Sequence, residues 1–74
     1  MKKIRFKKDV ELELVTSFDA DHDMPITELE TFKAGEVHEV ELIGPTHDHY
    51  DVQFGNGHLA MHVFQPEVFD ILSD

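Results

Sequence analysis

Apolar and polar residues alternate along much of the chain, and this alternation predicts β-strands. Val10, Leu12 and Leu14 alternate with glutamates, and the same period recurs in residues 37–43. A period of two places one set of side chains on a buried face and the other set in solvent. Residues 26–32 are expected to be extended as well.

The segment that follows residue 49 predicts a β-hairpin around Asn56-Gly57. A type I′ turn needs positive φ at both central residues, and Asn-Gly favours it strongly. With these two residues as the loop, the register pairs Phe54 with Leu59, Val52 with Met61, Asp51 with His62, and Tyr50 with Val63. One face of the hairpin is then Tyr50, Val52, Phe54, Leu59, Met61 and Val63, and the other is Asp51, Gln53, His58, Ala60 and His62.

Turn-forming residues separate the predicted strands. Residues 17–25, SFDADHDMP, are rich in aspartate, lack a hydrophobic period and end in proline, so we expect a long exposed loop. Residues 33–36, KAGE, form a turn, and Gly44-Pro45-Thr46 is expected to end the strand over residues 37–43. Because proline favours the first helical position, residues 66–69 suit one 3₁₀ turn before a last strand over residues 70–72.

Together these elements predict a single all-β domain over residues 1–74, built as a small barrel of about five strands. A chain of 74 residues buries only about 60% of its unfolded surface, so we expect modest stability. The sequence shows no internal repeat and no convincing amphipathic helix. The predicted core consists of Val10, Leu12, Leu14, Val40, Leu42, Val52, Phe54, Leu59, Met61 and Val63.

The order of these elements resembles an SH3-like barrel. The turn KAGE and the segment DVQFGNGHLAMHV are similar to a pattern in small stand-alone bacterial and phage proteins of that fold, whose function is uncharacterised. The resemblance covers most of residues 9–72 and consists of turn and core signals, so it implies a fold and no activity. Peptide-binding SH3 domains have an aromatic-rich groove for proline-rich ligands. This chain has no tryptophan, and its only tyrosine, Tyr50, is assigned to the core, so polyproline binding is not expected.

The charge of the chain is unevenly distributed. Five of the six basic residues lie in residues 1–8, whereas residues 9–74 carry one lysine and all 16 acids, a formal charge of 1 − 16 = −15. Such a surface argues against direct nucleic-acid binding, which needs basic groups for the phosphates. It permits a basic protein partner, divalent cations or mimicry of a polyanion, and solubility alone also explains it. Residues 1–8 are interpreted as an edge strand whose lysines discourage further pairing, or else as an arm that contacts an acidic partner.

Several classes of protein are disfavoured by what the sequence lacks. The chain has no cysteine, which excludes disulfides and thiolate metal sites and fits a reducing compartment. No apolar run approaches the roughly 20 residues of a membrane span, and no apolar signal segment follows the basic N-terminus. Neither serine lies in a nucleophile motif. We therefore expect a cytoplasmic protein that has no membrane partner and is not an enzyme.

The six histidines suggest a different kind of site. Alternation places His47, His49 and Asp51 on one strand face, and the predicted register places His62 opposite Asp51. Imidazole and carboxylate groups at this spacing suit zinc, nickel or copper. A solvated outer face, in which Asp51 pairs with His62, accounts for the same pattern, so the expectation is no cofactor, with zinc or nickel as the alternative. His38 has inward parity and is interpreted as a core or rim residue hydrogen-bonded to backbone.

A second group of oxygen ligands lies in residues 17–25. Asp19, Asp21, His22 and Asp23 resemble an alternating calcium loop, but the glycine and the distant glutamate of an EF-hand are missing. A charged surface loop is therefore the favoured interpretation.

Three functions from different classes remain open. The first is a non-catalytic interaction or accessory module that binds another protein, expected to be basic, through its acidic surface. The second is a polyanion mimic that occupies a nucleic-acid-binding protein, and the third is a divalent-metal-binding protein that uses the histidine face. A single continuous stripe of strand glutamates favours mimicry and a scattered set disfavours it; these residues are Glu11, Glu13, Glu28, Glu30, Glu39 and Glu41.

Overall fold

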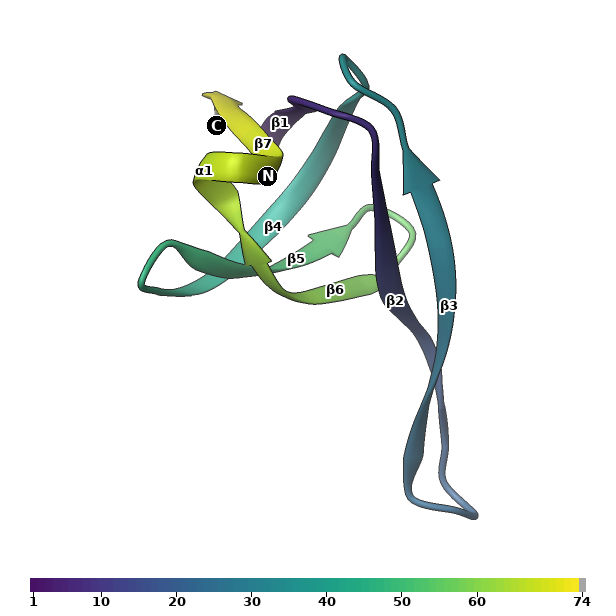
Figure 1. The fold of residues 1–74 in the computed structure, drawn as a ribbon. Helices are drawn as coiled ribbons and strands as arrows, with labels where there is room; N and C mark the ends of the chain where they lie inside the picture. Colours follow the sequence, from purple (N-terminus) through teal and green to yellow (C-terminus); the bar gives the residue numbers. More distant parts are fainter. Residues whose placement is uncertain (74) are drawn as a thin grey trace.

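The computed structural model of the chain describes residues 1–73, apart from the side chains of Pro45 and Ser73. It confirms an all-β fold: seven strands form one antiparallel sheet in the order β3-β2-β6-β5-β4-β1-β7 (Figure 1). The strands are β1 (Lys2–Phe6), β2 (Val10–Asp19), β3 (Met24–Phe32), β4 (Val37–Thr46), β5 (His49–Phe54), β6 (Leu59–Phe64) and β7 (Phe69–Ser73). A four-residue α-helix, α1 (Gln65–Val68), precedes β7 in place of the expected 3₁₀ turn.

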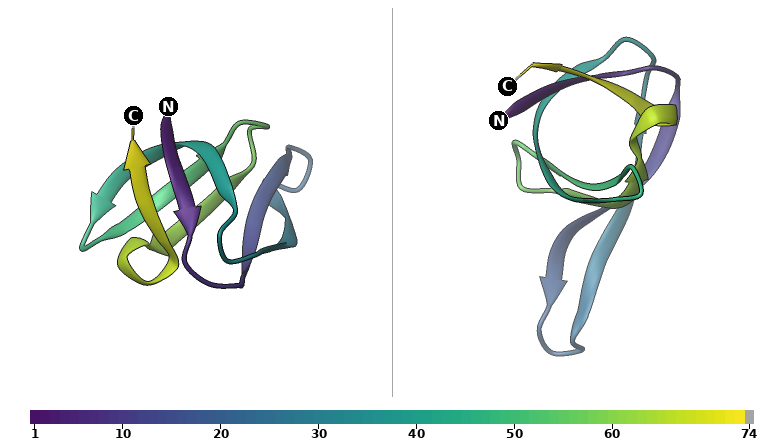
Figure 2. Two further views of the ribbon diagram at one scale, coloured as in Figure 1. Left: turned by 90° about the horizontal axis from the view of Figure 1, so that it is seen from above. Right: turned by 90° about the vertical axis from the view of Figure 1, so that its left-hand side faces the viewer.

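The sheet curls around one core but does not close. Figure 2 shows the strands of the body wrapped into a ring, with the β2–β3 hairpin leaving it on one side. The two outer strands of the sheet, β3 and β7, do not pair with each other. The fold therefore has more strands than the five expected, and it has two free edges. The basic segment contributes β1, which lies between β4 and β7 and is not the edge strand suggested by its lysines.

A row of stacked aromatic rings fills the centre of the core. Phe32 stacks on Phe6 with ring centroids 4.6 Å apart and on Phe54 at 5.1 Å. Of the predicted core, Leu14, Val40, Val52, Phe54 and Val63 are buried, while Val10, Leu12, Leu42 and Leu59 are half-buried. Prediction missed six buried residues, namely Ile4, Phe6, Phe32, Ala60, Val68 and Phe69.

Met61 is the one predicted core residue that is exposed, at 53%, and the reason is the register of the β5–β6 hairpin. The loop has three residues, because Phe54 N–H donates to His58 O. Gly57 has the expected positive φ of 89°, but Asn56 does not share it, so the turn is not type I′. Val52 consequently pairs with Ala60 instead of Met61, and Ala60 becomes the buried residue.

A bulge in β6 then restores the predicted register farther from the turn. Tyr50 pairs with Val63, as expected, while Asp51 lies opposite the extra residue of the bulge. His62 adopts a φ of 56° there, and its backbone N–H donates to Asp51 Oδ1 at 3.1 Å. The predicted side-by-side pair of Asp51 and His62 is therefore wrong: the carboxylate binds the backbone of the bulge.

The two-residue turn with positive φ lies between β4 and β5. His47 and Asp48 have φ values of 52° and 66°, and the flanking residues Thr46 and His49 pair directly. Residues 44–46 do not end β4 as predicted. Gly44, with φ of 52°, takes up a register shift in the β4–β5 pairing, so the strand bends and continues.

The predicted loop over residues 17–25 is instead the end of a long hairpin. β2 and β3 pair from Val10↔Phe32 to Asp19↔Met24, with one register shift at Thr16. A four-residue turn closes the hairpin, in which the Asp21 N–H donates to Asp19 Oδ1. Only Leu14 and Val15 of β2 pair with β6, so residues 16–27, here called the arm, project from the body. The molecule is accordingly elongated, with extents of 39 × 23 × 21 Å.

Candidate interaction surface

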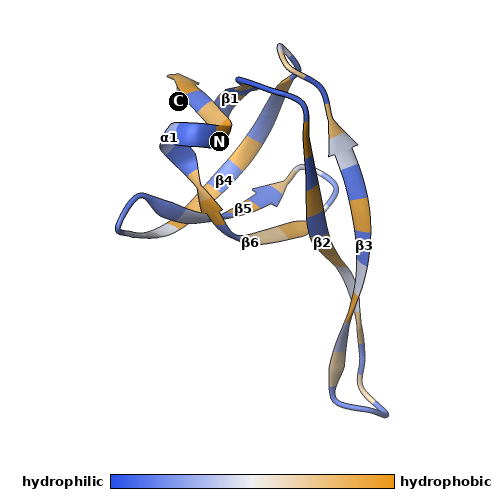
Figure 3. Ribbon diagram, in the orientation of Figure 1, coloured by the Kyte–Doolittle hydropathy of each residue, from blue (hydrophilic) through white to orange (hydrophobic). Residues whose placement is uncertain are grey.

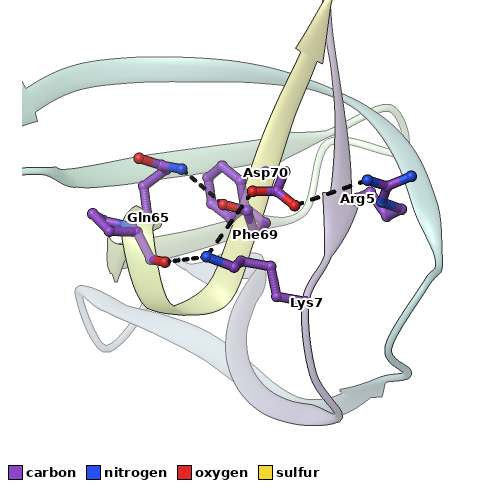
Figure 4. A network of polar contacts seen from close by, with 6 residues as sticks. Arg5, Lys7, Gln65, Phe69 and Asp70 are labelled. Carbon is purple, nitrogen blue, oxygen red and sulfur yellow. Dashed lines mark hydrogen bonds and ion pairs between the residues drawn. The ribbon is translucent and has the colours of Figure 1, made fainter.

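Arg5, Lys7 and Lys8, near the N-terminus, contact acids of the body itself. The Asp70 carboxylate lies between Arg5 and Lys7 (Figure 4), 3.9 Å from Arg5 Nη2 and 4.0 Å from Lys7 Nζ, and Lys7 Nζ also donates to Pro66 O at 2.7 Å. Lys8 pairs with Glu67 at 2.8 Å, and this contact lowers the pKa of the Glu67 carboxyl. The segment is therefore a strand that fastens the two chain ends together, and these side chains are engaged within the fold.

The β2–β3 hairpin, residues 10–32, has the opposite character. It carries seven acids and no lysine or arginine. Within the part of the chain that the structure describes, none of these acids pairs with a lysine or arginine. The acids are Glu11, Glu13, Asp19, Asp21, Asp23, Glu28 and Glu30. The negative charge of this hairpin is thus left open to solvent and to a partner.

Large apolar side chains lie exposed on the same hairpin. Phe18, Met24 and Leu29 are 60%, 59% and 65% exposed, and Ile26 is 46% exposed. Figure 3 shows hydrophobic and hydrophilic residues interspersed along β2 and β3. The sequence predicts an exposed loop over residues 17–25, so Phe18 and Met24 are not expected on a strand, and the extended segment that holds Ile26 and Leu29 gives no sign that these two are exposed. The signal was present in the four residues Ala20–Asp23, which suit a tight turn between two paired strands.

The six predicted partner-binding glutamates are all exposed, but they do not form one stripe. Residues paired across an antiparallel sheet point to the same face. Leu14 pairs with Glu28 and Leu12 with Glu30, so these two glutamates share the face of the core, here called the inner face. Glu11 and Glu13 alternate with those leucines and point to the outer face. Glu39 and Glu41 belong to another strand, β4, and of these two only Glu39 lines a hollow together with Glu30.

Two small hollows flank Glu30 on the inner face. One, of about 180 Å³, is lined by Glu30, Glu39, His38 and the rings of Phe32 and Phe54. The other, of about 200 Å³, lies between Glu28, Glu30, Leu14 and His58. Both are smaller than the roughly 300–1,000 Å³ of sites for drug-sized ligands. Their size and their carboxylates suit single basic side chains.

His38 lies at the rim of the first hollow, as expected, although its hydrogen-bond partner differs. Its ring packs edge-on against Phe6, Phe32 and Phe54, with centroid distances of 5.7, 5.3 and 5.6 Å. His38 Nε2 lies 3.1 Å from Glu36 Oε1, so the partner is a carboxylate and not backbone. The Lys33 backbone N–H and then His38 donate to Glu36 and hold the pKa of this carboxyl below its ordinary value of 4.5.

The histidine face does not assemble into a metal centre. His47 lies in the β4–β5 turn, its backbone O 3.1 Å from His49 Nδ1, and the His49 ring packs against Phe64 at 5.0 Å. Asp51 binds the backbone N–H of His62. Among the residues that the structure describes, no three histidine or acidic side chains are placed to hold a metal ion together.

The Asp19 carboxylate is likewise used locally, in the turn of the arm. Asp19 accepts hydrogen bonds from the Asp21 N–H at 3.1 Å, and its other oxygen lies 2.7 Å from His22 Nδ1. Asp23 adopts a φ of 54° and completes the turn. The resemblance of this segment to a calcium loop is thus explained by the hydrogen bonds that close a hairpin.

Comparisons of the chain with protein-family models, with curated proteins and with solved structures found no match. No helix within residues 1–73 is long and apolar enough to cross a membrane.

Proposed function

We propose that this chain is a non-catalytic, SH3-like interaction module of the cytoplasm, which binds a basic protein through the acidic surface of the β2–β3 hairpin. The SH3-like character is supported by the pairing of the first and last strands and by the single helical turn before β7. The cytoplasmic location stays a prediction from the sequence. The observation that carries the function is the separation of charge within the molecule.

This separation distinguishes a binding surface from a generally acidic protein. Arg5, Lys7 and Lys8 neutralise acids at the C-terminal end of the body, and Lys33 lies 3.7 Å from Asp9. The hairpin receives no such compensation although it projects farthest from the body and carries exposed apolar side chains. Carboxylates that surround exposed apolar groups attract a basic partner, and the apolar groups then supply surface that is buried in the contact.

Polyanion mimicry is less well supported by the same surface. A mimic of nucleic acid needs carboxylates in a continuous row, spaced like phosphates. The strand glutamates divide between the inner face, the outer face and β4, so a single duplex-binding groove would meet only some of them.

The proposal is tested by capture from a lysate of the native host and by kinetics with the purified captured protein. We expect association to be fast at low salt and to slow as ionic strength rises, because the charges of the encounter are screened. Charge reversal by E28K/E30K slows association further, and E39K/E41K does so to a smaller extent, because Glu28 and Glu30 both line hollows beside the hairpin whereas only Glu39 of the β4 pair does. Binding that is independent of salt, and that only apolar variants weaken, would overturn the proposal.

A further inference from the structure

We propose that the partner contributes an extended basic segment that pairs with the free edge of β3 as an added strand. This inference rests on the proposed function and specifies how the acidic hairpin recognises its partner. In this arrangement the backbone of β3 forms the hydrogen bonds to the partner segment, and Glu28 and Glu30 select a segment with basic side chains.

The edge of β3 is open along most of its length. β3 is an outermost strand of the sheet, and residues 24–31 are all exposed. It contains no lysine and no bulge, since the extra residue at the register shift belongs to β2. Proteins usually protect such an edge by these devices, by proline, by inward-pointing charges or by making it short. The inward-pointing charges of β3 are Glu28 and Glu30, which oppose an acidic strand but not a basic one. Pro25 lies near the turn, so the stretch from Ile26 onward retains unpaired backbone groups that can accept another strand.

The other edge of the sheet provides an internal contrast. β7 has five residues against nine in β3, and Asp70 in β7 is engaged by Arg5 and Lys7. A short strand offers few backbone groups to a partner. We therefore assign the binding edge to β3 and not to β7.

Charge selects the occupant of this edge. Side chains directly opposite one another on neighbouring strands have Cβ atoms about 4.5–5.5 Å apart, within reach of an ion pair. A second copy of β3 would bring glutamates of both chains together on the inner face, so self-pairing is disfavoured. A strand with lysine or arginine at alternate positions places these side chains beside Glu28 and Glu30, where the two hollows receive them.

The hollow nearer β4 favours a basic side chain on further grounds. It combines the Glu30 and Glu39 carboxylates with the rings of Phe32 and Phe54. Aromatic carbon beside carboxylates accommodates the long alkyl stem and the charged end of lysine or arginine. On the outer face, the exposed Leu29 lies between Thr27 and Thr31, so the intervening partner residues are expected to be apolar or β-branched.

The test uses the full chain and a blocked seven-residue peptide that alternates lysine with valine and threonine. Affinity is measured by calorimetric titration at low salt. Amide exchange, followed by NMR, shows which strand gains protection. We expect newly protected amides in β3 and none in β7. A second peptide is N-methylated at two central residues whose backbone N–H groups point to opposite edges of the peptide strand. A methylated amide cannot donate a hydrogen bond to the sheet, so this peptide should bind at least about tenfold more weakly.

A matched pair of variants separates local recognition from general charge. E28K/E30K and E11K/E13K change the net charge equally and lie on opposite faces of one hairpin. We expect E28K/E30K to weaken peptide binding by at least about tenfold and E11K/E13K to weaken it much less, since only the first pair adjoins the added strand. NMR spectra of both variants establish that they are folded.

The possible failures are distinguishable. Equal effects of the two variants, full affinity of the N-methylated peptide, or exchange protection outside β3 would overturn edge pairing. Concentration-dependent dimers with protected β3 amides in the absence of peptide would assign the edge to a second copy instead. In each of these cases the proposed function still stands if the captured protein binds in a salt-dependent manner, and it falls only if that dependence is absent.

Discussion

The β2–β3 hairpin and the body of the molecule are made of the same antiparallel strands, yet they use their side chains in opposite ways. In the body, strands curl so that one face of each is covered, and Ile4, Val40 and Phe69 are fully buried. In the arm, which projects from the body, most side chains face solvent, including the large apolar Phe18 and Met24.

The difference shows that strand pairing and core formation are separable in this fold. The arm is held by backbone hydrogen bonds and by the side-chain bonds of Asp19 in its turn. An isolated two-stranded hairpin is only marginally stable in water, so the arm depends on the β2–β6 pairing at its base. A segment kept exposed at such low intrinsic stability is suited to contact another molecule rather than to support the fold.

The largest expected difference in stability comes from removing one phenylalanine ring from the body and one from the arm. Phe54→Ala should cost about 3–5 kcal/mol, because Phe54 stacks on Phe32 and is only 7% exposed. Phe18→Ala should change stability by no more than about 0.5 kcal/mol, because Phe18 is 60% exposed on the arm. Chemical denaturation measures both values. If Phe54→Ala still melted cooperatively at 37 °C, or Phe18→Ala were the more damaging change, the division between body and arm would be wrong.

Alternation in the sequence predicted part of the core of the body and gave no prediction for the arm, for a physical reason. Hydrophobic residues at every second position indicate which face of a strand is buried, and this pattern correctly predicted that Leu14, Val40 and Val52 are buried. The arm beyond Val15 buries neither face, and no burial pattern is therefore encoded there. The two strands of the arm pair across a four-residue turn, whereas the composition of residues 17–25 predicts a long loop.

Errors in the candidate sites came from a register change of one residue. Because side chains alternate, a shift of one residue moves each side chain to the opposite face. Because the loop at Gly57 has three residues, Ala60 is buried and Met61 is exposed, the reverse of the prediction. The bulge at His62 brings the Asp51 carboxylate to a backbone N–H, where a histidine–aspartate side-chain pair was predicted. The exposed glutamates were predicted correctly as surface residues, but their division between two faces of the hairpin required the observed pairing.

An intermediate effect is expected at the β5–β6 turn, which belongs to the body. Gly57→Val should destabilise the fold by about 1–3 kcal/mol, since Gly57 has a φ of 89° that a β-branched residue adopts only with strain. An added Cβ meets nothing within 4 Å, so the cost lies in the backbone and not in a clash. Gly55→Ala is the matched control, because Gly55 has equal space and no positive φ. Thermal unfolding of both variants should separate them clearly, and equal melting temperatures would mean that the turn does not constrain the chain.

The smallest expected effect concerns the pH dependence of the body near its KAGE turn. The Lys33 N–H and His38 hold the pKa of Glu36 below its ordinary value of 4.5. A lowered pKa in the folded state contributes stability above the unfolded value, and this contribution is lost as pH falls from 4.5 through the folded value. Glu36→Gln should therefore lower the melting temperature at pH 7 by about 1–4 °C, as expected for an exposed carboxylate.

The control for the Glu36→Gln measurement is Glu28→Gln, a substitution in β3. Within residues 1–73 the Glu28 carboxylate accepts no hydrogen bond and forms no ion pair, so Glu28→Gln removes a carboxylate that the fold does not use. Melting temperatures of the two variants and of the unchanged chain are compared at pH 7 and at steps below pH 4.5. The deficit of Glu36→Gln should disappear in acid, because the unchanged chain then loses the same interaction. A deficit that persists at the lowest pH would show that the Glu36 side chain acts through packing and not through its charge.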